Sequence, residues 1–331
     1  MTAPEAQPEF PLIMDMSKPL EETDLASLYY TCQEWGIFLV ANHGIPMEVP
    51  DKVYSLSKPL FNFPFQAKRK IGPGSTFRSY TPPFVVSPFF ESIRVNGPDF
   101  GASATNWSSA LVGEPQLELC EALGEYGAKL QELAKRIVSM LLASLGDGMK
   151  KAHESEFARC HGYLRINNYI PPDGDCVEFE GLGMHTDMSC ITIVYQDQIG
   201  GLKARANSGE WVDIEPREGV LAVNIGDMLR AWSNGKLRAS EHKVVLKAST
   251  GRLSMAFFWS FEDEKVIWAP EEMVGKGFPR VYKPFLCLDY VKFREEGGDC
   301  EDFDRVGITV DDFARIRDQE YSNSQTEKIQ L

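Results

Sequence analysis

HGYLRINNYI at residues 161–170 begins a series of seven short strand-like runs, and RLSMAFFWSF at 252–261 ends it. The runs between them are rich in β-branched or aromatic residues: CITIVYQD (190–197), GLKARA (201–206), EWVDIEP (210–216), VLAVNIGD (220–227) and SEHKVVL (240–246). Gly, Pro, Asn or Asp residues separate successive runs, as is typical of short antiparallel strands. The pattern predicts an antiparallel barrel or jelly roll.

The residues before this segment favour helices. Between 114 and 145, Leu, Tyr and Ile recur every three or four positions and glycines follow at 146 and 148, so we expect a long amphipathic helix. A shorter helix is expected over 21–35, followed by a buried strand at Ile37–Ala41. Near the end of the chain, Thr309 precedes two aspartates and predicts the capped start of a last helix.

These elements predict a mainly β protein with helices (α+β), in which an N-terminal helical part precedes the strands. We expect four parts: an N-terminal helix and strand region packing on the core (1–110), long scaffold helices (111–160), the jelly-roll catalytic core (161–290), and an acidic loop with a helix (291–331).

The composition is that of an ordinary globular protein and does not favour nucleic-acid binding. The chain has 331 residues, of which 43% are hydrophobic, and 34 basic against 48 acidic residues give a net charge of −14. This charge repels phosphate backbones, so no nucleic-acid partner is expected. No apolar run reaches the about 18 residues that cross a bilayer, and the first ten residues do not resemble a signal peptide. We expect a cytoplasmic monomer that acts on a small molecule, without a membrane partner.

Three side chains have the residue types and spacing of a metal site. His185 and Asp187 are two positions apart at the predicted end of a strand, where such side chains point to the same face. His242, on another strand of the sheet, offers a third ligand. Two imidazoles and one carboxylate form the facial set of non-haem Fe(II) oxygenases. The alternative, an exposed His and Asp at a strand end, is the usual meaning of such a tripeptide taken alone.

A second polar group favours the metal interpretation. Arg252 and Ser254 alternate along an otherwise apolar strand, and a guanidinium directed into a barrel is costly unless an anion meets it. Asn167 and Tyr169 alternate in the same way on the first strand. A dicarboxylate that binds iron at one end and Arg252 at the other would satisfy these groups.

Five motifs in this order resemble the plant 2-oxoglutarate and Fe(II)-dependent dioxygenase family, which includes gibberellin oxidases, flavonoid oxygenases and, among close relatives, isopenicillin N synthase. The motifs are WGIFLVANHGI (35–45), His185-x-Asp187, NIGDMLRAWSNGKLR (224–238), His242 and Arg252-x-Ser254. The resemblance implies a double-stranded β-helix, another name for the jelly roll. It extends from about Pro11 to the final helix.

The resemblance also implies the roles of the site residues. His185, Asp187 and His242 match the iron ligands, while Arg252 and Ser254 match the pair that holds the distal carboxylate of 2-oxoglutarate. The auxiliary co-substrate residues and the aromatic position beside the substrate are matched by Asn167, Tyr169 and Phe258. Fe(II), 2-oxoglutarate as co-substrate, O₂ and ascorbate as reductant are the implied cofactors.

The N-terminal loops supply further candidates for the substrate site. Phe84, Phe89 and Phe90 follow a stretch rich in Gly and Pro and would form a pocket wall or simply pack on the core. Arg78 and Arg94 flank these rings and could meet a carboxylate. The alternative is that both arginines are ordinary surface residues.

The expected activity is oxidation of a C–H bond in a small apolar plant metabolite or hormone. A carboxylic acid such as a gibberellin-type diterpenoid or an auxin is the favoured class. An Fe(II) oxidase of the same fold that uses no 2-oxoglutarate is one alternative, since such enzymes also carry an Arg-x-Ser pair. A ligand-binding protein on this scaffold is another. Asn167 and Tyr169 favour the 2-oxoglutarate-dependent reading.

Overall fold

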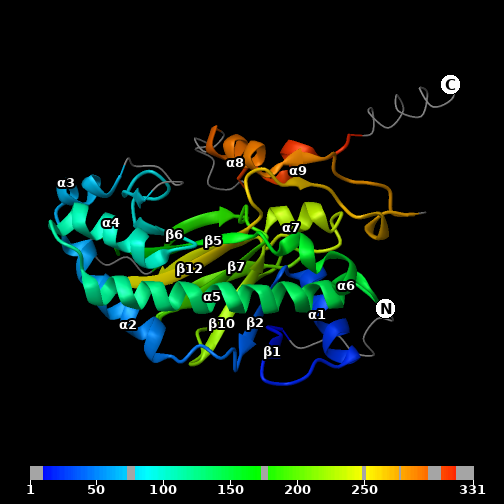
Figure 1. Ribbon diagram of the computed structural model, residues 1–331, viewed down its shortest axis with the longest axis horizontal. Helices are drawn as coiled ribbons and strands as arrows, with labels where there is room; N and C mark the ends of the chain where they lie inside the picture. The colour runs from blue at the N-terminus through cyan, green and yellow to red at the C-terminus, as the bar shows by residue number, and fades with distance from the viewer. Residues whose placement is uncertain are drawn as a thin grey trace.

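The computed structural model describes residues 10–72, 79–172, 178–247, 251–275, 277–296 and 307–317. Two sheets dominate it (Figure 1). The larger contains, in order, β1 (Ile13–Asp15), β2 (Ile37–Ala41), β10 (Val220–Ile225), β7 (Ile191–Gln196), β12 (Arg252–Ser260), β5 (His161–Tyr169), β4 (Phe90–Asn96) and β3 (Tyr80–Thr81). The smaller contains β6 (Glu178–His185), β11 (His242–Lys247), β8 (Leu202–Arg205) and β9 (Trp211–Asp213). Apart from the parallel pair β1 and β2, the pairings within these two sheets are antiparallel, as the jelly-roll prediction requires.

Strand β12 shows how the sequence assigns the two faces of the larger sheet. Leu253, Met255 and Phe257 belong to the main hydrophobic core, whereas Ala256 and Phe258 pack in a second cluster with residues of the smaller sheet. Successive side chains of a strand point to opposite faces, so this alternation directs Arg252 and Ser254 toward the space between the sheets.

The outer face of the larger sheet is covered by helices. Helix α5 (Leu117–Ser144) crosses it, and α1 (Glu22–Glu34), α2 (Glu48–Ser57) and α4 (Phe100–Val112) pack against α5 (Figure 1). Leu123, Leu130 and Ile137 of α5 are buried in the main core, at the helical spacing seen in the sequence. The long helix, the helix over 21–35 and the strand at Ile37–Ala41 are therefore confirmed.

The N-terminal region contributes strands as well as helices. Its strands β1 to β4 extend the larger sheet at both edges, so strands of this region are hydrogen-bonded to the strands of the core. The sequence reading missed β4 and β6. The strand signal of both is weak, because the segment before β4 is rich in Pro and β6 contains Gly181 and Gly183.

Three short helices from the second half of the chain lie close together. Helix α7 (Asp227–Trp232) follows β10, and α8 (Cys287–Glu296) and α9 (Val310–Ala314) pack near it (Figure 1). Thr309 caps α9 by accepting a hydrogen bond from the backbone N–H of Asp311, as the sequence predicts. Among the described residues, no helix combines the length and the apolar character needed to cross a bilayer.

Candidate functional site

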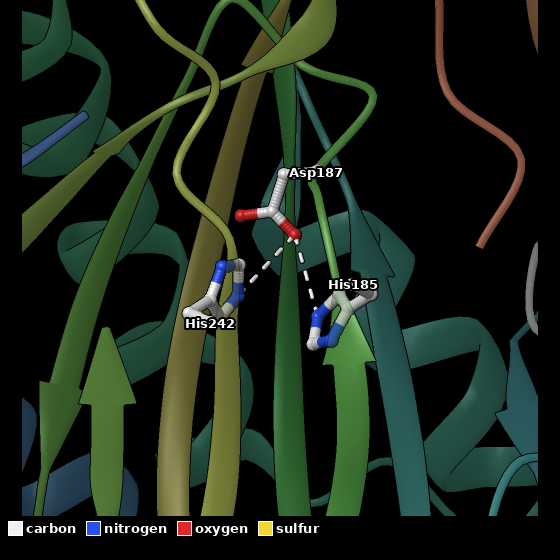
Figure 2. Close-up of side chains that lie close together, drawn as sticks. All are labelled: His185, Asp187 and His242. Carbon is white, nitrogen blue, oxygen red and sulfur yellow. Dashed lines mark ion pairs between the residues drawn. The ribbon is translucent and has the colours of Figure 1, made fainter. Parts of the chain in front are cut away.

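His185, Asp187 and His242 meet at the end of the smaller sheet (Figure 2). His185 is the last residue of β6 and His242 the first of β11, and the two are directly paired across the strands. The Oδ1 atom of Asp187 lies 3.8 Å from the Nε2 atoms of both histidines. One donor atom from each residue lies within 4.8 Å of the others, so a single ion can contact all three.

Hydrogen bonds orient both imidazoles for metal binding. Nδ1 of His185 lies 2.8 Å from the carbonyl oxygen of Gly183, and Nδ1 of His242 lies 3.0 Å from that of Ser240. A carbonyl only accepts, so each Nδ1 carries the proton and each Nε2 presents its lone pair toward Asp187. The Oδ2 atom of Asp187 is buried without a hydrogen-bond partner among the described residues. This donor set fits Fe(II), for which two histidines and one carboxylate are a characteristic set.

The ionisation states agree with this assignment. Burial, with the nearby His242, lowers the pKa of His185 to about 4. Burial raises the pKa of Asp187, but the neighbouring His242 and His185 outweigh it and hold that pKa below its ordinary value. At neutral pH the site therefore offers a neutral imidazole at His185 and a carboxylate at Asp187, the forms that bind a metal.

The convergence of Asp187 depends on contacts beyond the strand. Asp187 lies after the end of β6, so strand alternation alone does not place it. Its carbonyl oxygen accepts a 2.8 Å hydrogen bond from the backbone N–H of Asp227 at the start of α7. The side chain of Thr186 donates to Asp227 as well, at 3.0 Å. The turn that carries the ligand is thus fixed to α7.

Asp227, at the start of α7, belongs to a buried network of hydrogen bonds. Its fully buried carboxylate accepts hydrogen bonds from Thr186, Tyr290 and Arg294, and the Nη1 atom of Arg294 lies 2.8 Å from Oδ2. The Nη2 atom of Arg294 donates to the carbonyl oxygen of Thr186 at 3.0 Å. Helix α8 therefore holds the ligand turn through one guanidinium.

The four residues predicted to hold 2-oxoglutarate lie together between the sheets. Ser254 pairs with Asn167 across β12 and β5, and Arg252 pairs with Tyr169. The Nη1 atom of Arg252 donates to Ser254 Oγ at 3.0 Å, and its guanidinium lies 4.8 Å from the centre of the Tyr169 ring. Arg252 is 1% exposed, and within the described part of the chain its Nε has no hydrogen-bond partner and no carboxylate pairs with it. A buried cation in this state fits an anionic ligand.

The register relates Phe258 to the metal site. Phe258 of β12, Thr192 of β7 and Asn224 of β10 occupy one row across three strands. The side-chain nitrogen of Asn224 lies 3.5 Å from Nε2 of His242. Phe258 also stacks on Tyr163 of β5, with 4.7 Å between ring centres.

The N-terminal candidates are more dispersed. Phe84 is 82% exposed, and Phe89 packs on Phe179, in the cluster around Tyr169 rather than in the row of Phe258. Arg94 lies on β4 with its guanidinium 3.6 Å from the centre of the Tyr163 ring, so it joins the Phe258 stack. Arg78 lies outside the described residues.

Two polar residues on this inner surface were not identified from the sequence. Asn224 contacts His242, and Arg165 lies two residues before Asn167 on β5. The alternation that selects Asn167 and Tyr169 also selects Arg165, so a signal was present. Asn224 begins one of the recognised motifs. Arg294 has no such signal, because it lies on a distant helix.

The chain matches known proteins over both of its halves. Residues 162–260 match the family model of the 2OG-Fe(II) oxygenase superfamily, and residues 11–89 match that described as non-haem dioxygenase in morphine synthesis N-terminal. A gibberellin 20-oxidase-like protein of Arabidopsis thaliana is 47% identical over 324 residues, which cover 93% of this chain and 98% of the relative. Feruloyl CoA ortho-hydroxylase 1 of Arabidopsis thaliana is 33% identical and covers 85% of this chain and 78% of its own.

Solved structures show the same fold. A dioxygenase for auxin oxidation in rice superposes with a TM-score of 0.74 at 27% identity, covering 90% of this chain and 99% of its own. The complex of the Arabidopsis thaliana dioxygenase for auxin oxidation 1 with 2-oxoglutarate superposes with a TM-score of 0.73 at 26% identity. The match covers 81% of this chain and 99% of the solved chain. The jelly-roll prediction and the predicted family are both confirmed. Together with the histidine and aspartate site, these matches show that the chain belongs to the 2OG-Fe(II) oxygenase superfamily and is a 2-oxoglutarate-dependent dioxygenase.

Proposed function

We propose that this dioxygenase oxidises a C–H bond of a small, largely apolar, ring-containing acid. The observation that carries the proposal is the stack of Arg94, Tyr163 and Phe258, which ends in the same row of the sheet as Asn224 beside His242. Aromatic faces favour a flat or cyclic apolar substrate, and a guanidinium beside them favours an acid. The names of the relatives, which include gibberellin oxidases and a dioxygenase for auxin oxidation, support a gibberellin-type diterpenoid or an auxin.

In this proposal each group of residues has a separate task. His185, Asp187 and His242 would hold Fe(II), which when bound couples O₂ reduction to substrate oxidation and to decarboxylation of 2-oxoglutarate into succinate and CO₂. Arg252 and Ser254 would bind the distal carboxylate and so orient the co-substrate, with Asn167 and Tyr169 as further contacts. The apolar walls around Phe258 would exclude water from the reacting carbon.

Succinate formation tests the proposal. Purified protein with Fe(II), ascorbate and 2-oxoglutarate should form succinate faster when the correct acid is present, and a panel of gibberellin precursors, auxins and phenylpropanoid acids would identify it. Asp187→Ala should abolish the reaction, whereas Asp213→Ala, at an exposed carboxylate of β9, should not. Full turnover by the Asp187→Ala protein would contradict the metal assignment.

The aromatic wall has its own control. Phe258→Ala should weaken binding of the identified substrate by about 1–3 kcal/mol through lost apolar contact, while 2-oxoglutarate decay without substrate stays unchanged. An unchanged substrate KM would place the substrate on another wall.

We also expect the protein to act as a monomer in the cytoplasm with ascorbate as reductant. Light scattering after size-exclusion chromatography, localisation of a tagged chain, and turnover with and without ascorbate test these three points. A dimer, another compartment or turnover that ignores ascorbate would contradict the respective expectation.

A further inference from the structure

The inner face of the larger sheet is organised in rows that cross β12, β5 and β4. The register gives four of them: Arg252, Tyr169 and Phe90; Ser254, Asn167 and Ser92; Ala256, Arg165 and Arg94; and Phe258, Tyr163 and Asn96. Rows on one face are two residues apart, or about 6.8 Å. The first two rows contain the residues assigned to 2-oxoglutarate, and the fourth contains the aromatic stack. In the third row only Arg94 has a role in the proposed function, and Arg165 has none.

The third row holds a buried cation whose hydrogen bonding is incomplete. Arg165 is 8% exposed, and its Nη1 donates to the hydroxyls of Thr81 at 3.1 Å and Ser92 at 2.6 Å. Its Nη2 is buried and has no hydrogen-bond partner among the residues that the structure describes. Burial without an anion is costly for a guanidinium, and it lowers the pKa of Arg165 to about 10.

A second cation increases the positive charge of this row. Arg94 is directly paired with Arg165 across β4 and β5, which places the two Cβ atoms about 5 Å apart. Like charges in this relation repel, and the charge of Arg94 also contributes to the lowered pKa of Arg165. No described carboxylate forms an ion pair with Arg165. Glu91, the nearest acidic residue along β4, points to the other face and pairs with Lys68.

We propose that Arg165, with Arg94 beside it, binds a carboxylate of the substrate. An anion in this row would accept a hydrogen bond from Nη2 of Arg165 and would reduce the repulsion between the two cations. Ala256 is the β12 member of the row and has only a methyl side chain, so little of the row is filled from that strand. The inference rests on the proposed function and specifies which residue recognises the acid.

The position of Arg165 limits the size of the substrate. A carboxylate in the third row and a ring against Phe258 and Tyr163 in the fourth are separated by one row, about 6.8 Å. This distance suits an acid whose carboxylate is one or two carbons from its ring. The third row is also distinct from the first two rows, which contain the residues assigned to the carboxylate of 2-oxoglutarate.

Equilibrium binding tests the proposal without turnover. Protein loaded with Mn²⁺ and 2-oxoglutarate under argon would be titrated calorimetrically with phenylacetate, indole-3-acetate, cinnamate and benzoate, and with the neutral amide of each. We expect at least one acid to bind at least tenfold more tightly than its amide. In Arg165→Met this preference should disappear, while the affinity for the amide changes less than threefold.

Control proteins separate charge recognition from folding. Arg159→Met, at an exposed arginine, should retain the preference for the acid. If Arg165→Met does not fold, Arg165→Lys serves instead: it should bind the acid at least fivefold more weakly, because an ammonium cannot reproduce the planar fork. Circular dichroism and urea unfolding would establish that each protein is folded.

Three results would overturn the proposal: equal binding of acids and amides, a preference that survives in Arg165→Met, and no binding of any of the four acids at 10 mM. If Arg165→Met instead weakens 2-oxoglutarate binding and leaves the acid preference intact, the carboxylate is that of the co-substrate and the proposal is wrong. Decarboxylation of 2-oxoglutarate by the Fe(II)-loaded wild-type protein is measured separately. Its absence would contradict the proposed function, whereas the binding preference concerns Arg165 alone.

Discussion

At the scale of single residues, the candidate site contains buried cations that no carboxylate of the described residues neutralises. Arg252 is almost fully buried, yet its described partners are neutral: Ser254, Gln196 and the ring of Tyr169. Removing a guanidinium from water is unfavourable unless charge-assisted hydrogen bonds replace the lost hydration. A carboxylate bound beside Arg252 would therefore stabilise this position.

Replacing Arg252 should mainly affect 2-oxoglutarate. Arg252→Ala leaves the bound carboxylate without its partner, and we expect a loss of about 2–5 kcal/mol in 2-oxoglutarate binding, or roughly 30- to 5,000-fold. Arg252→Lys should also be impaired, because a point charge does not replace the two-pronged donor. Calorimetric titration of the Mn²⁺-loaded protein measures the effect. An unchanged 2-oxoglutarate affinity in Arg252→Ala would locate the carboxylate site elsewhere.

The charge of Arg165 gives a pH dependence with a definite sign. Its pKa is lowered to about 10, so the cation persists through neutral pH and is lost as the pH rises through about 10. Binding of the substrate acid should therefore be constant between pH 7 and 9 and weaken above that range. Titrations in matched ionic strength test this expectation, with the neutral amide as control. Acid binding that strengthens toward pH 10 would be inconsistent with a guanidinium at this position.

At the scale of elements, the metal site is assembled where three segments end. Strand β6 ends at His185, β11 begins at His242, and the turn carrying Asp187 is bonded to the start of α7. Helix α8 adds Arg294, which contacts both Asp227 and the backbone of Thr186. The geometry of the ligands thus depends on a helix that supplies none of them.

Removing Arg294 should affect stability and metal affinity together. Arg294→Ala leaves the buried Asp227 without its cation, and we expect a loss of about 3–5 kcal/mol in the free energy of unfolding. Metal affinity should fall about 10- to 100-fold, as is usual when a group that orients metal ligands is lost. Urea unfolding and Mn²⁺ titration by electron paramagnetic resonance measure the two effects.

The same helix supplies a control for this variant. Lys292→Ala, at an exposed position of α8, should change stability by less than about 0.5 kcal/mol and leave metal affinity unaltered. If Arg294→Ala binds Mn²⁺ as tightly as the wild type, the contact with the ligand turn has no positioning role.

At the scale of the whole molecule, the candidate site takes its residues from both sheets. His185 and His242 belong to the smaller sheet, whereas Arg252, Ser254 and Asn167 belong to the larger. A co-substrate that contacts the metal and Arg252 together therefore links the sheets across the interior. Ligands that bind only the folded chain stabilise it by mass action.

Stability should consequently rise with metal and co-substrate. At a hundred times its dissociation constant, 2-oxoglutarate should add about 2.7 kcal/mol to the free energy of unfolding of the Mn²⁺-loaded protein. Urea unfolding under argon measures the gain. The same 2-oxoglutarate concentration should give little gain in Arg252→Ala, and chelation of the metal should remove it in the wild type. An equal gain in all three samples would mean that 2-oxoglutarate binds outside this site.

From the sequence alone follow the core strands other than β4 and β6, the long helix and the set of candidate site residues. Alternation is a local property, so a strand such as RLSMAFFWSF specifies which of its side chains face the interior, and ordered motifs identified the family. The same reasoning could have included Arg165, because it alternates with Asn167 and Tyr169. The prediction that Asp187 shares a face with His185 relied on strand alternation. Strand β6 ends at His185, so alternation does not place Asp187.

The contacts between elements that are distant along the chain depend on the tertiary structure. The convergence of Asp187 requires α7 and Arg294, which is more than a hundred residues away along the chain. The pairing of Arg94 with Arg165 requires β4 to lie beside β5, and the exposure of Phe84 depends on how its loop leaves the sheet. Local periodicity fixes the face on which a residue lies, whereas packing between elements fixes its neighbours, and the charges and contacts of those neighbours set its chemistry.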